Sequence, residues 1–329
     1  MVWLQFIFSA VVIVFAAIQL AKYGDVIAIR TRLGGMFVGV ILLAGATSLP
    51  ELLTTISAVQ QGVPNLAAGN LLGSNMINMF LLAILDLMHR KERLLRKAAL
   101  KHALSGSLAV LMIGMVVFFI MANIQGSVGW VGIDSLAIIV VYVISIRLIQ
   151  TNASHSSSPA SSDVIPEGTP SLKRGLLGFL IAAGVLVVIT PVLVSASVGI
   201  AEITGLGTTF IGTTLVALVT SLPELVTTIA AARMGADDMA IGNLFGSNLF
   251  NMFALGLTDF FYLQGRFLGV VDPAFLLVGM LGLLMTSMAL IGNLARLERR
   301  ILFIELDSLA LILVYLGGLW LLYSRGVTP

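Results

Sequence analysis

The chain has 329 residues, of which 58% are hydrophobic and 10% are charged, with a net charge of +2 and a mean hydropathy of +1.07. Soluble domains carry about 25% charged residues, so this composition excludes an ordinary soluble protein and indicates a chain that lies mostly in lipid. The chain has no cysteine, which excludes disulfides and thiolate metal sites.

Ten apolar runs along the chain are long enough to cross a bilayer, which takes about 20 residues per helix. The first run is interpreted as a membrane helix and not as a removed signal peptide, because it lacks a basic leader and a small-residue cleavage site. The sequence therefore predicts an all-α membrane protein with ten transmembrane helices, at residues 3–21, 34–59, 64–87, 99–121, 128–149, 176–199, 207–231, 238–260, 267–292 and 302–323.

The basic residues indicate how these helices are oriented. If the N-terminus is outside, every Lys and Arg except Arg266 and Arg325 falls on the cytoplasmic side, as the positive-inside rule requires. Both termini are then expected outside. Residues 150–172 are rich in Ser, Pro, Gly and Thr, and are expected to form a flexible cytoplasmic linker.

The two halves of the chain repeat one another at a constant offset of 173 residues. The segment Thr47–Glu51 recurs as Thr220–Glu224, and Gly69-Asn70, Gly73-Ser74-Asn75 and Asn78 recur as Gly242-Asn243, Gly246-Ser247-Asn248 and Asn251. Each half holds five predicted helices, an odd number, so the second half must be inverted relative to the first. Inverted repeats with interrupted helices are typical of secondary transporters.

Two carboxylates fall near the middle of the membrane, Glu51 and Glu224, at the same depth in their repeats. Such a group is costly in lipid unless it faces a cavity, a partner or an ion. A structural ion pair is disfavoured, because the central stretches of the predicted helices 34–59, 64–87, 207–231 and 238–260 contain no Lys, Arg or His. The pair therefore indicates a site for a cation or for protons.

The residues around these carboxylates supply further oxygen ligands. Pro50 and Pro223 lack an N–H, which frees the carbonyls of Ala46 and Val219. The hydroxyls of Thr47 and its repeat-related residue Thr220 lie one helical turn before the carboxylates. Ser74 and Ser247 stand in the same relation to Asn78 and Asn251. An all-oxygen set suits hard cations such as calcium or sodium.

At these motifs the sequence resembles the cation/calcium exchanger superfamily, and most closely prokaryotic sodium/calcium exchangers. The resemblance covers nearly the whole chain and implies two five-helix repeats, at residues 1–149 and 173–329, with the family's alpha-repeats at 37–86 and 210–259. It implies metal-site roles for Glu51, Glu224, Asn78, Asn251, Thr47, Ser48, Thr220, Ser221, Ser74 and Ser247, and for the carbonyls of Ala44 and Ala217.

The sequence departs from the family pattern at one pair of positions. Sodium/calcium exchangers generally have an acidic residue at one of the positions of Asn78 and Asn251, and here both are amides. The centre then holds two carboxylates instead of three, which leaves the coupling ion and the stoichiometry open.

The expected function is calcium export coupled to sodium entry by alternating access across the plasma membrane. A calcium/proton antiporter of the same fold and a passive cation channel remain as alternatives. The expected partners are calcium, sodium or protons, and membrane lipid. The chain is expected to be a monomer. No cofactor, nucleic-acid partner or enzymatic activity is expected, because no nucleophile–base pair and no nucleotide-binding fingerprint is present.

Overall fold

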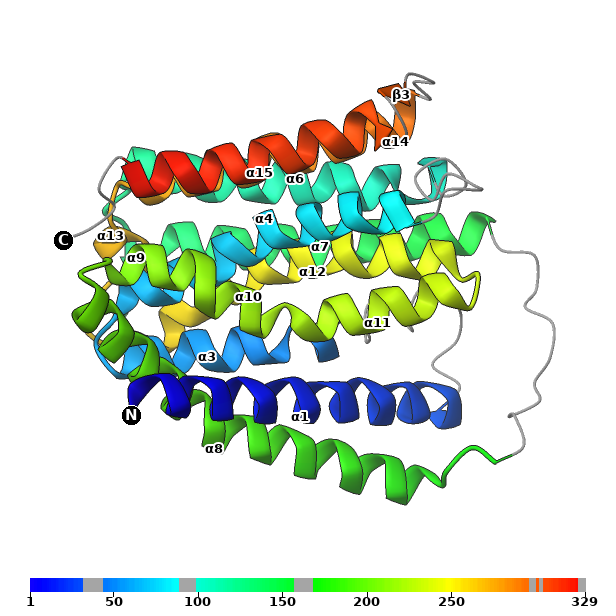
Figure 1. Cartoon of the computed structure of the whole chain (residues 1–329), viewed down its shortest axis with the longest axis horizontal. Helices are drawn as coiled ribbons and strands as arrows, with labels where there is room; N and C mark the ends of the chain where they lie inside the picture. The colour runs from blue at the N-terminus through cyan, green and yellow to red at the C-terminus, as the bar shows by residue number, and fades with distance from the viewer. Residues whose placement is uncertain (32–43, 89–98, 157–167, 296–299, 302–303, 325–329) are drawn as a thin grey trace.

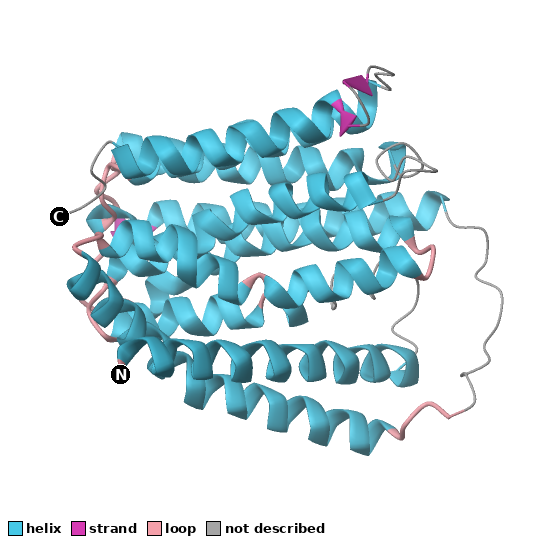
Figure 2. Cartoon of the chain, viewed as in Figure 1, coloured by secondary structure: helices cyan, strands magenta, loops and turns pink. Residues whose placement is uncertain are grey.

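The structure is a computed structural model that describes residues 1–31, 44–88, 99–156, 168–295, 300–301 and 304–324. Within these residues it is almost entirely helical, and its long helices run side by side along one axis (Figures 1 and 2). Seven described helices are long and apolar enough to cross a membrane: α1 (Val2–Thr31), α4 (Pro64–Met88), α6 (Ala99–Ala122), α7 (Ile133–Ser156), α8 (Leu172–Thr204), α14 (Phe275–Ala295) and α15 (Leu306–Ser324).

An eighth crossing is possible where two helical stretches, Thr208–Thr220 and Leu222–Arg233, meet at a bend of 40°. The remaining long helix, α12 (Asp237–Thr258), is not among the seven apolar ones. The predicted span 34–59 lies partly outside the described residues, and its described part contains α3 (Leu49–Gln60). The predicted count of ten spans therefore remains a prediction.

The helices differ in how deeply they are buried. In the most apolar 18-residue stretch of each helix, 89% is buried in α4, compared with 22% in α7 and 28% in α15. Helix α4 packs against α3, α12 and α14, so it forms the centre of the bundle. Along one edge, α1 and α8 pack against each other (Figure 1).

The first half of the bent crossing contains a π-helical turn. It consists of α9 (Thr208–Ile211), the π-helix η1 (Gly212–Val216) and α10 (Ala217–Thr220), and α11 (Leu222–Arg233) follows. Helix α4 approaches η1 so closely that a Cβ added to Gly73 would lie 2.4 Å from the Thr213 carbonyl oxygen. Small residues permit this contact between helix backbones.

The two halves of the chain also meet at one end of the bundle. A short hairpin, β1 (Ser127–Val128) with β2 (Val131–Gly132), precedes α7, and the 3₁₀ turn η2 (Asp259–Phe261) and α13 (Phe267–Val270) follow α12. The Asp259 carboxylate accepts hydrogen bonds from the N–H groups of Gly132 at 2.7 Å and Phe267 at 2.5 Å. Beside it, Arg266 pairs with Asp134 at 2.7 Å. The second hairpin, β3 (Arg300–Ile301) with β4 (Ile304–Glu305), precedes α15.

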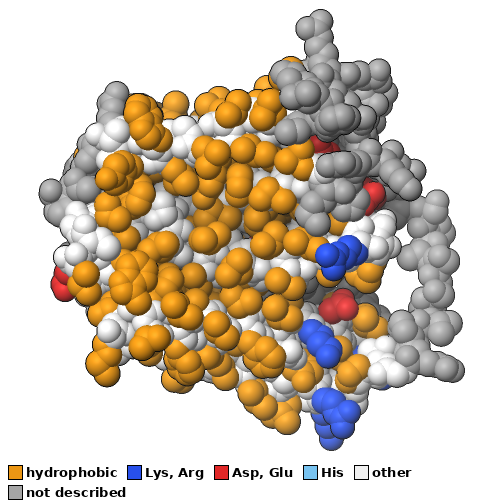
Figure 3. Space-filling view, in the orientation of Figure 1, with side chains coloured by type: hydrophobic (Ala, Val, Ile, Leu, Met, Phe, Trp, Pro, Cys, Tyr) orange, Lys and Arg blue, Asp and Glu red, His pale blue; other side chains and the backbone are white. Residues whose placement is uncertain are grey.

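The outer surface matches a lipid environment. Hydrophobic side chains cover most of the face shown in Figure 3, and Lys and Arg gather at one end of it. Among the described residues, large apolar side chains such as Phe8, Leu180, Val188 and Trp320 are more than half exposed along the outer helices. An apolar belt with basic groups toward one end is the pattern of an integral membrane protein.

Candidate functional site

The two carboxylates predicted for the membrane centre both follow a break in a helix. Glu51 lies in the first turn of α3 and Glu224 in the first turn of α11, and both side chains are fully buried. The residue before each helix leaves helical geometry in the same way, Ser48 with φ −88° and ψ 6° and Ser221 with φ −86° and ψ 0°. The prolines that follow lack the N–H that would continue the helical ladder, which explains the break.

Each carboxylate is held by a hydroxyl from the other half of the chain. Ser48 Oγ donates to Glu224 Oε1 at 2.8 Å, and the repeat-related Ser221 Oγ donates to Glu51 Oε1 at 3.3 Å. Ser247 Oγ lies 3.5 Å from Glu224 Oε1. In the described part of the chain, neither Glu51 Oε2 nor Glu224 Oε2 has a hydrogen-bond partner, although both atoms are buried. One oxygen of each carboxylate is therefore uncommitted.

The two central asparagines show the same pattern. Asn78 in α4 donates from Nδ2 to Asn248 Oδ1 at 2.9 Å, and Asn251 in α12 donates to Asn75 Oδ1 at 3.1 Å. Both Oδ1 atoms are buried without a partner among the described residues, and so is Ser74 Oγ. The site thus contains several buried oxygens that the described protein leaves without a bond. Burying a polar oxygen without a partner costs free energy, so these oxygens are suited to coordinating a bound cation.

The threonines that precede the helix breaks are fixed by asparagines across the bundle. Thr220 Oγ1 donates to Asn70 Oδ1 at 2.9 Å, and Thr47 Oγ1 lies 3.4 Å from Asn243 Oδ1. The amide of Asn70 in turn donates to the Glu51 carbonyl at 3.0 Å. The two threonine–asparagine contacts join the two repeats, and the Asn70–Glu51 bond connects one of them to the break before α3.

The carbonyls of Ala44 and Ala217 already accept hydrogen bonds. Ala44 O receives Ser48 N–H at 2.9 Å and the Thr47 hydroxyl at 3.2 Å. Ala217 O receives Ser221 N–H at 3.0 Å and lies 3.3 Å from Thr220 Oγ1. Their predicted role as ligands remains a prediction.

Among the described residues, no basic side chain balances the charges at the site. Neither Glu51 nor Glu224 forms an ion pair with a described residue, and the ion pair Arg266–Asp134 lies at one end of the bundle. The carboxylates repel one another. No group of three or more acidic or histidine side chains that could hold a metal occurs in the described chain. A site with two carboxylates and neutral oxygens can balance two positive charges.

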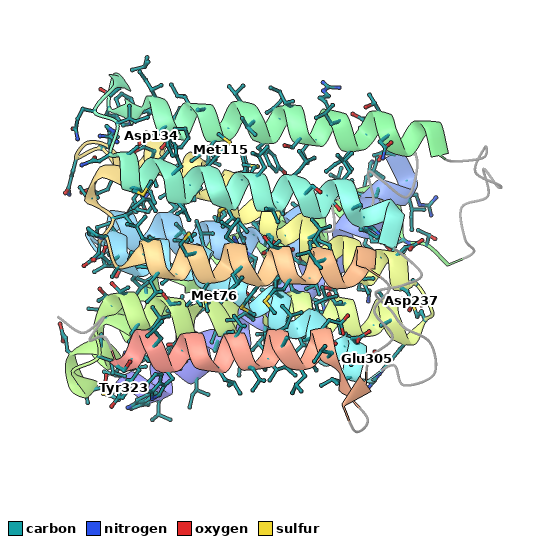
Figure 4. The ribbon with its side chains drawn as sticks, turned by 90° about the horizontal axis from the view of Figure 1, so that it is seen from above. Met76, Met115, Asp134, Asp237, Glu305 and Tyr323 are labelled. Carbon is teal, nitrogen blue, oxygen red and sulfur yellow. The ribbon has the colours of Figure 1, made fainter. Side chains whose placement is uncertain are left out.

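The site lies about midway along the bundle. Met76, which follows Asn75 in α4, is placed between the end marked by Asp134 and Tyr323 and the end marked by Asp237 and Glu305 (Figure 4). All twelve predicted site residues are described by the structure and buried, and they come from residues 44–51, from residues 217–224 and from α4 and α12.

The sequence prediction did not include four asparagines of the site, Asn70, Asn75, Asn243 and Asn248. Their recurrence at the 173-residue offset was a signal that could have identified them. Thr286 in α14, within reach of Asn248, was also not included. Its repeat-related position is Ile113, so the repeat gave no signal for it.

Known proteins resemble this chain over most of its length. A family model described as sodium/calcium exchanger protein matches residues 1–149 and 174–324. The chain is 26% identical over 329 residues to the putative antiporter CaxA of Alkalimonas amylolytica, covering 95% of this chain and 96% of the relative. It is 26% identical over 280 residues to the sodium/calcium exchanger MaX1 of Methanosarcina acetivorans, covering 73% and 77%.

Two solved structures share the fold. The H+/Ca2+ exchanger CAX superposes with a TM-score of 0.72 at 14% identity, over 99% of this chain and 85% of that chain. The sodium-calcium exchanger NCX_Mj superposes with a TM-score of 0.61 at 21% identity, over 97% of this chain and 99% of that chain. At these identities the likeness concerns the fold alone.

Proposed function

The chain belongs to the sodium/calcium exchanger protein family, and we propose that it exports calcium from the cell in exchange for sodium. It is an integral membrane cation/calcium antiporter; sodium as the coupling ion is our proposal. Calcium and sodium are its cargo, and the proposal requires no cofactor.

The observation that carries this proposal is the set of uncommitted oxygens at the centre of the bundle. Glu51 Oε2, Glu224 Oε2, Asn78 Oδ1 and Asn251 Oδ1 are buried and make no hydrogen bond in the described structure. Calcium takes six to eight oxygen ligands in a flexible geometry, which such a set can begin to supply. The two carboxylates offset the charge of one calcium, and they would equally offset two sodium ions. The two ions would therefore compete for one site, as antiport requires.

We assign the metal site to all twelve predicted residues: Glu51, Glu224, Asn78, Asn251, Thr47, Ser48, Thr220, Ser221, Ser74, Ser247, Ala44 and Ala217. The symmetry of the Ser48–Glu224 and Ser221–Glu51 contacts supports this assignment, since each half supplies equivalent groups. The carboxylates would bind calcium directly, and the hydroxyls and carbonyls would contribute to sodium binding.

We further propose ten spans arranged as two inverted five-helix repeats in the plasma membrane, with both termini outside. The N-terminus and Tyr323 lie at the same end of the bundle (Figures 1 and 4), which an even number of spans requires. Residues 150–172 would connect the repeats on the cytoplasmic side. Alternating access would then follow from movement of one part of the bundle around the central site.

Calcium/proton exchange is the second candidate. Glu51 and Glu224 are fully buried without a basic partner in the described structure, so each would be neutralised by one proton as readily as by one sodium. The solved structure that superposes with a TM-score of 0.72 is that of an H+/Ca2+ exchanger, which supports this alternative.

The deciding experiment is calcium uptake into vesicles that contain the purified protein. We expect sodium-loaded vesicles to accumulate calcium above its external concentration, and expect much less uptake when a pH gradient replaces the sodium gradient. The reverse result would identify protons as the coupling ion. Calcium entry that never exceeds equilibrium under either gradient would indicate a channel and contradict antiport.

A further inference from the structure

We propose that Thr286 in α14 is a positioning residue that turns the carbonyl oxygen of Asn78 toward the transported cation. This inference rests on the proposed function. Thr286 lies outside the helices that carry the predicted ligands, and it acts through Asn248 in α12, the residue that Asn78 contacts.

The orientation of the Asn248 amide follows from the two groups that face it. Thr286 Oγ1 donates its proton to the Gly282 carbonyl at 2.7 Å, so toward Asn248 it offers only lone pairs. The Asn75 carbonyl, 3.4 Å from Asn248 Nδ2, can only accept. The Asn248 atom that faces both groups, at 3.3 Å from Thr286 Oγ1, must therefore be the amide nitrogen.

This orientation determines the orientation of Asn78. Because the amide nitrogen of Asn248 is directed at Thr286 and Asn75, its Oδ1 atom faces Asn78. Asn78 must therefore direct its NH₂ group at Asn248, and it donates to Oδ1 at 2.9 Å. The Oδ1 atom of Asn78 is then turned away from Asn248, and it is buried without another partner in the described structure. An asparagine in the opposite orientation would direct an NH₂ group at the cation and repel it. Thr286 thus favours the orientation in which Asn78 is a ligand.

The repeat-related asparagine lacks this control. Position 286 corresponds to Ile113 at the 173-residue offset, which also relates Gly106 to Gly279 and Met112 to Met285. Asn75, which accepts from Asn251, has a buried Nδ2 atom without a partner in the described part of the chain. If Asn75 and Asn251 both reversed, they would still share one hydrogen bond. The structure therefore makes Asn78 a fixed oxygen ligand and Asn251 an adjustable one.

Thr286→Val removes the hydroxyl and keeps the shape of the side chain. We expect the apparent affinity for calcium to fall about tenfold with little change in the maximal rate. Loss of a hydrogen-bond partner of a metal ligand typically lowers metal affinity by about 10- to 100-fold. The lower value is expected here because the Asn75 carbonyl still accepts from Asn248. Thr286→Ser should retain the wild-type affinity. The matched control is Thr258→Val in α12, since Thr258 is also fully buried and also donates to a carbonyl four residues back at 2.7 Å.

A second background separates positioning from a structural role. In Asn78→Asp, either side-chain oxygen can face the cation, and a carboxylate prefers the NH₂ group of Asn248 to its oxygen. Thr286→Val should then cause no loss of calcium affinity, whereas a structural defect would persist in both backgrounds.

Calcium titration of the purified protein provides the affinity, and uptake into sodium-loaded vesicles provides the rate. Equal affinities for Thr286→Val and Thr258→Val would overturn the positioning role while leaving calcium exchange intact. A wild type that neither binds nor transports calcium would instead contradict the proposed function, and the inference would fall with it.

Discussion

The charge of the site depends on Asn78 and Asn251. Sodium/calcium exchangers generally have an acidic residue at one of these two positions, and this chain has an amide at both. Asn78 and Asn251 contribute neutral oxygens, so when both carboxylates are ionised the site carries about −2, from Glu51 and Glu224 alone. One calcium, two sodium ions or two protons bring it to neutrality. A third sodium would leave an uncompensated positive charge in a low-dielectric interior, which is costly. The residues at the site therefore favour an exchange in which little net charge moves.

We predict that calcium–sodium exchange by the wild type is nearly electroneutral and that Asn251→Asp makes it electrogenic. The added carboxylate is opposed by two like charges, so it ionises only when an additional cation binds, and that cation adds a transported charge. Charge movement coupled to transport can be measured in vesicles under a clamped potential. A wild type that carries one net positive charge per calcium would refute this argument from site charge.

How much of the site the sequence predicts depends on what each residue does. The carboxylates, hydroxyls and amides that we propose as ligands can be proposed from the sequence because their chemistry is unusual at mid-membrane and because they recur at a fixed offset. The bonds between Thr220 and Asn70, or between Ser48 and Glu224, were not, because they depend on which turn of one helix faces another. Thr286 was hidden for a further reason, since a buried helical threonine can satisfy its hydroxyl with the carbonyl four residues earlier in its own helix, as Thr286 does with Gly282.

At the scale of the elements, α4 of the first half and the π-helical turn η1 of the second half are in close backbone contact. A Cβ on Gly73 would lie 2.7 Å from Thr213 Cα, and one on Gly69 would lie 2.8 Å from Thr213 N. These are backbone atoms, so no side-chain rotation can relieve the overlap. The helix breaks at Ser48 and Ser221 were predictable from Pro50 and Pro223. The π turn was not, because no residue of Gly212–Val216 is specific to that geometry.

We predict that Gly73→Ala lowers the free energy of unfolding of the purified protein by about 1–3 kcal/mol, because the added methyl group overpacks a backbone contact. The repeat-related Gly246→Ala should cost less, since its nearest neighbour is the Cβ of Ala44 at 3.1 Å. Gly184→Ala in α8 is the control, with no atom within 4 Å of the added Cβ. The melting temperatures of the three variants, measured from the folded fraction that size-exclusion chromatography detects after heating, would rank their stabilities. Equal stability of Gly73→Ala and Gly184→Ala would show that α4 and η1 are not in rigid contact.

At the scale of the whole molecule, the ends of the bundle differ in charge. Lys and Arg gather at one end of the face in Figure 3, in line with the predicted cytoplasmic side. The same end contains the start of α8, where Ser171 caps the helix by accepting from Arg174 N–H at 3.4 Å. Arg30 at the end of α1 donates to the carbonyls of Thr169 and Pro170 there, which ties the two edge helices together.

Orientation in the membrane is tested with single cysteines, since the chain has none of its own. Thr151 and Gln125 are exposed at opposite ends of α7 and its preceding loop. We expect Thr151→Cys to react with an impermeant reagent only from the cytoplasmic side, and Gln125→Cys only from outside. The opposite pattern would overturn the orientation inferred from the basic residues. Labelling of both positions from one side would contradict an α7 that spans the membrane.

The most direct test of the account is sodium-driven calcium accumulation by the wild type, Glu51→Gln and Glu224→Gln, compared in the same vesicle preparation. Glutamine keeps the volume and one oxygen but removes the charge that compensates for stripping water from calcium. Both variants are expected to fold and insert like the wild type, because in the described structure neither carboxylate has a basic partner to lose. We expect calcium accumulation by the wild type and none by either variant. Undiminished accumulation by Glu51→Gln or Glu224→Gln would contradict the claim that this pair of carboxylates carries the ion.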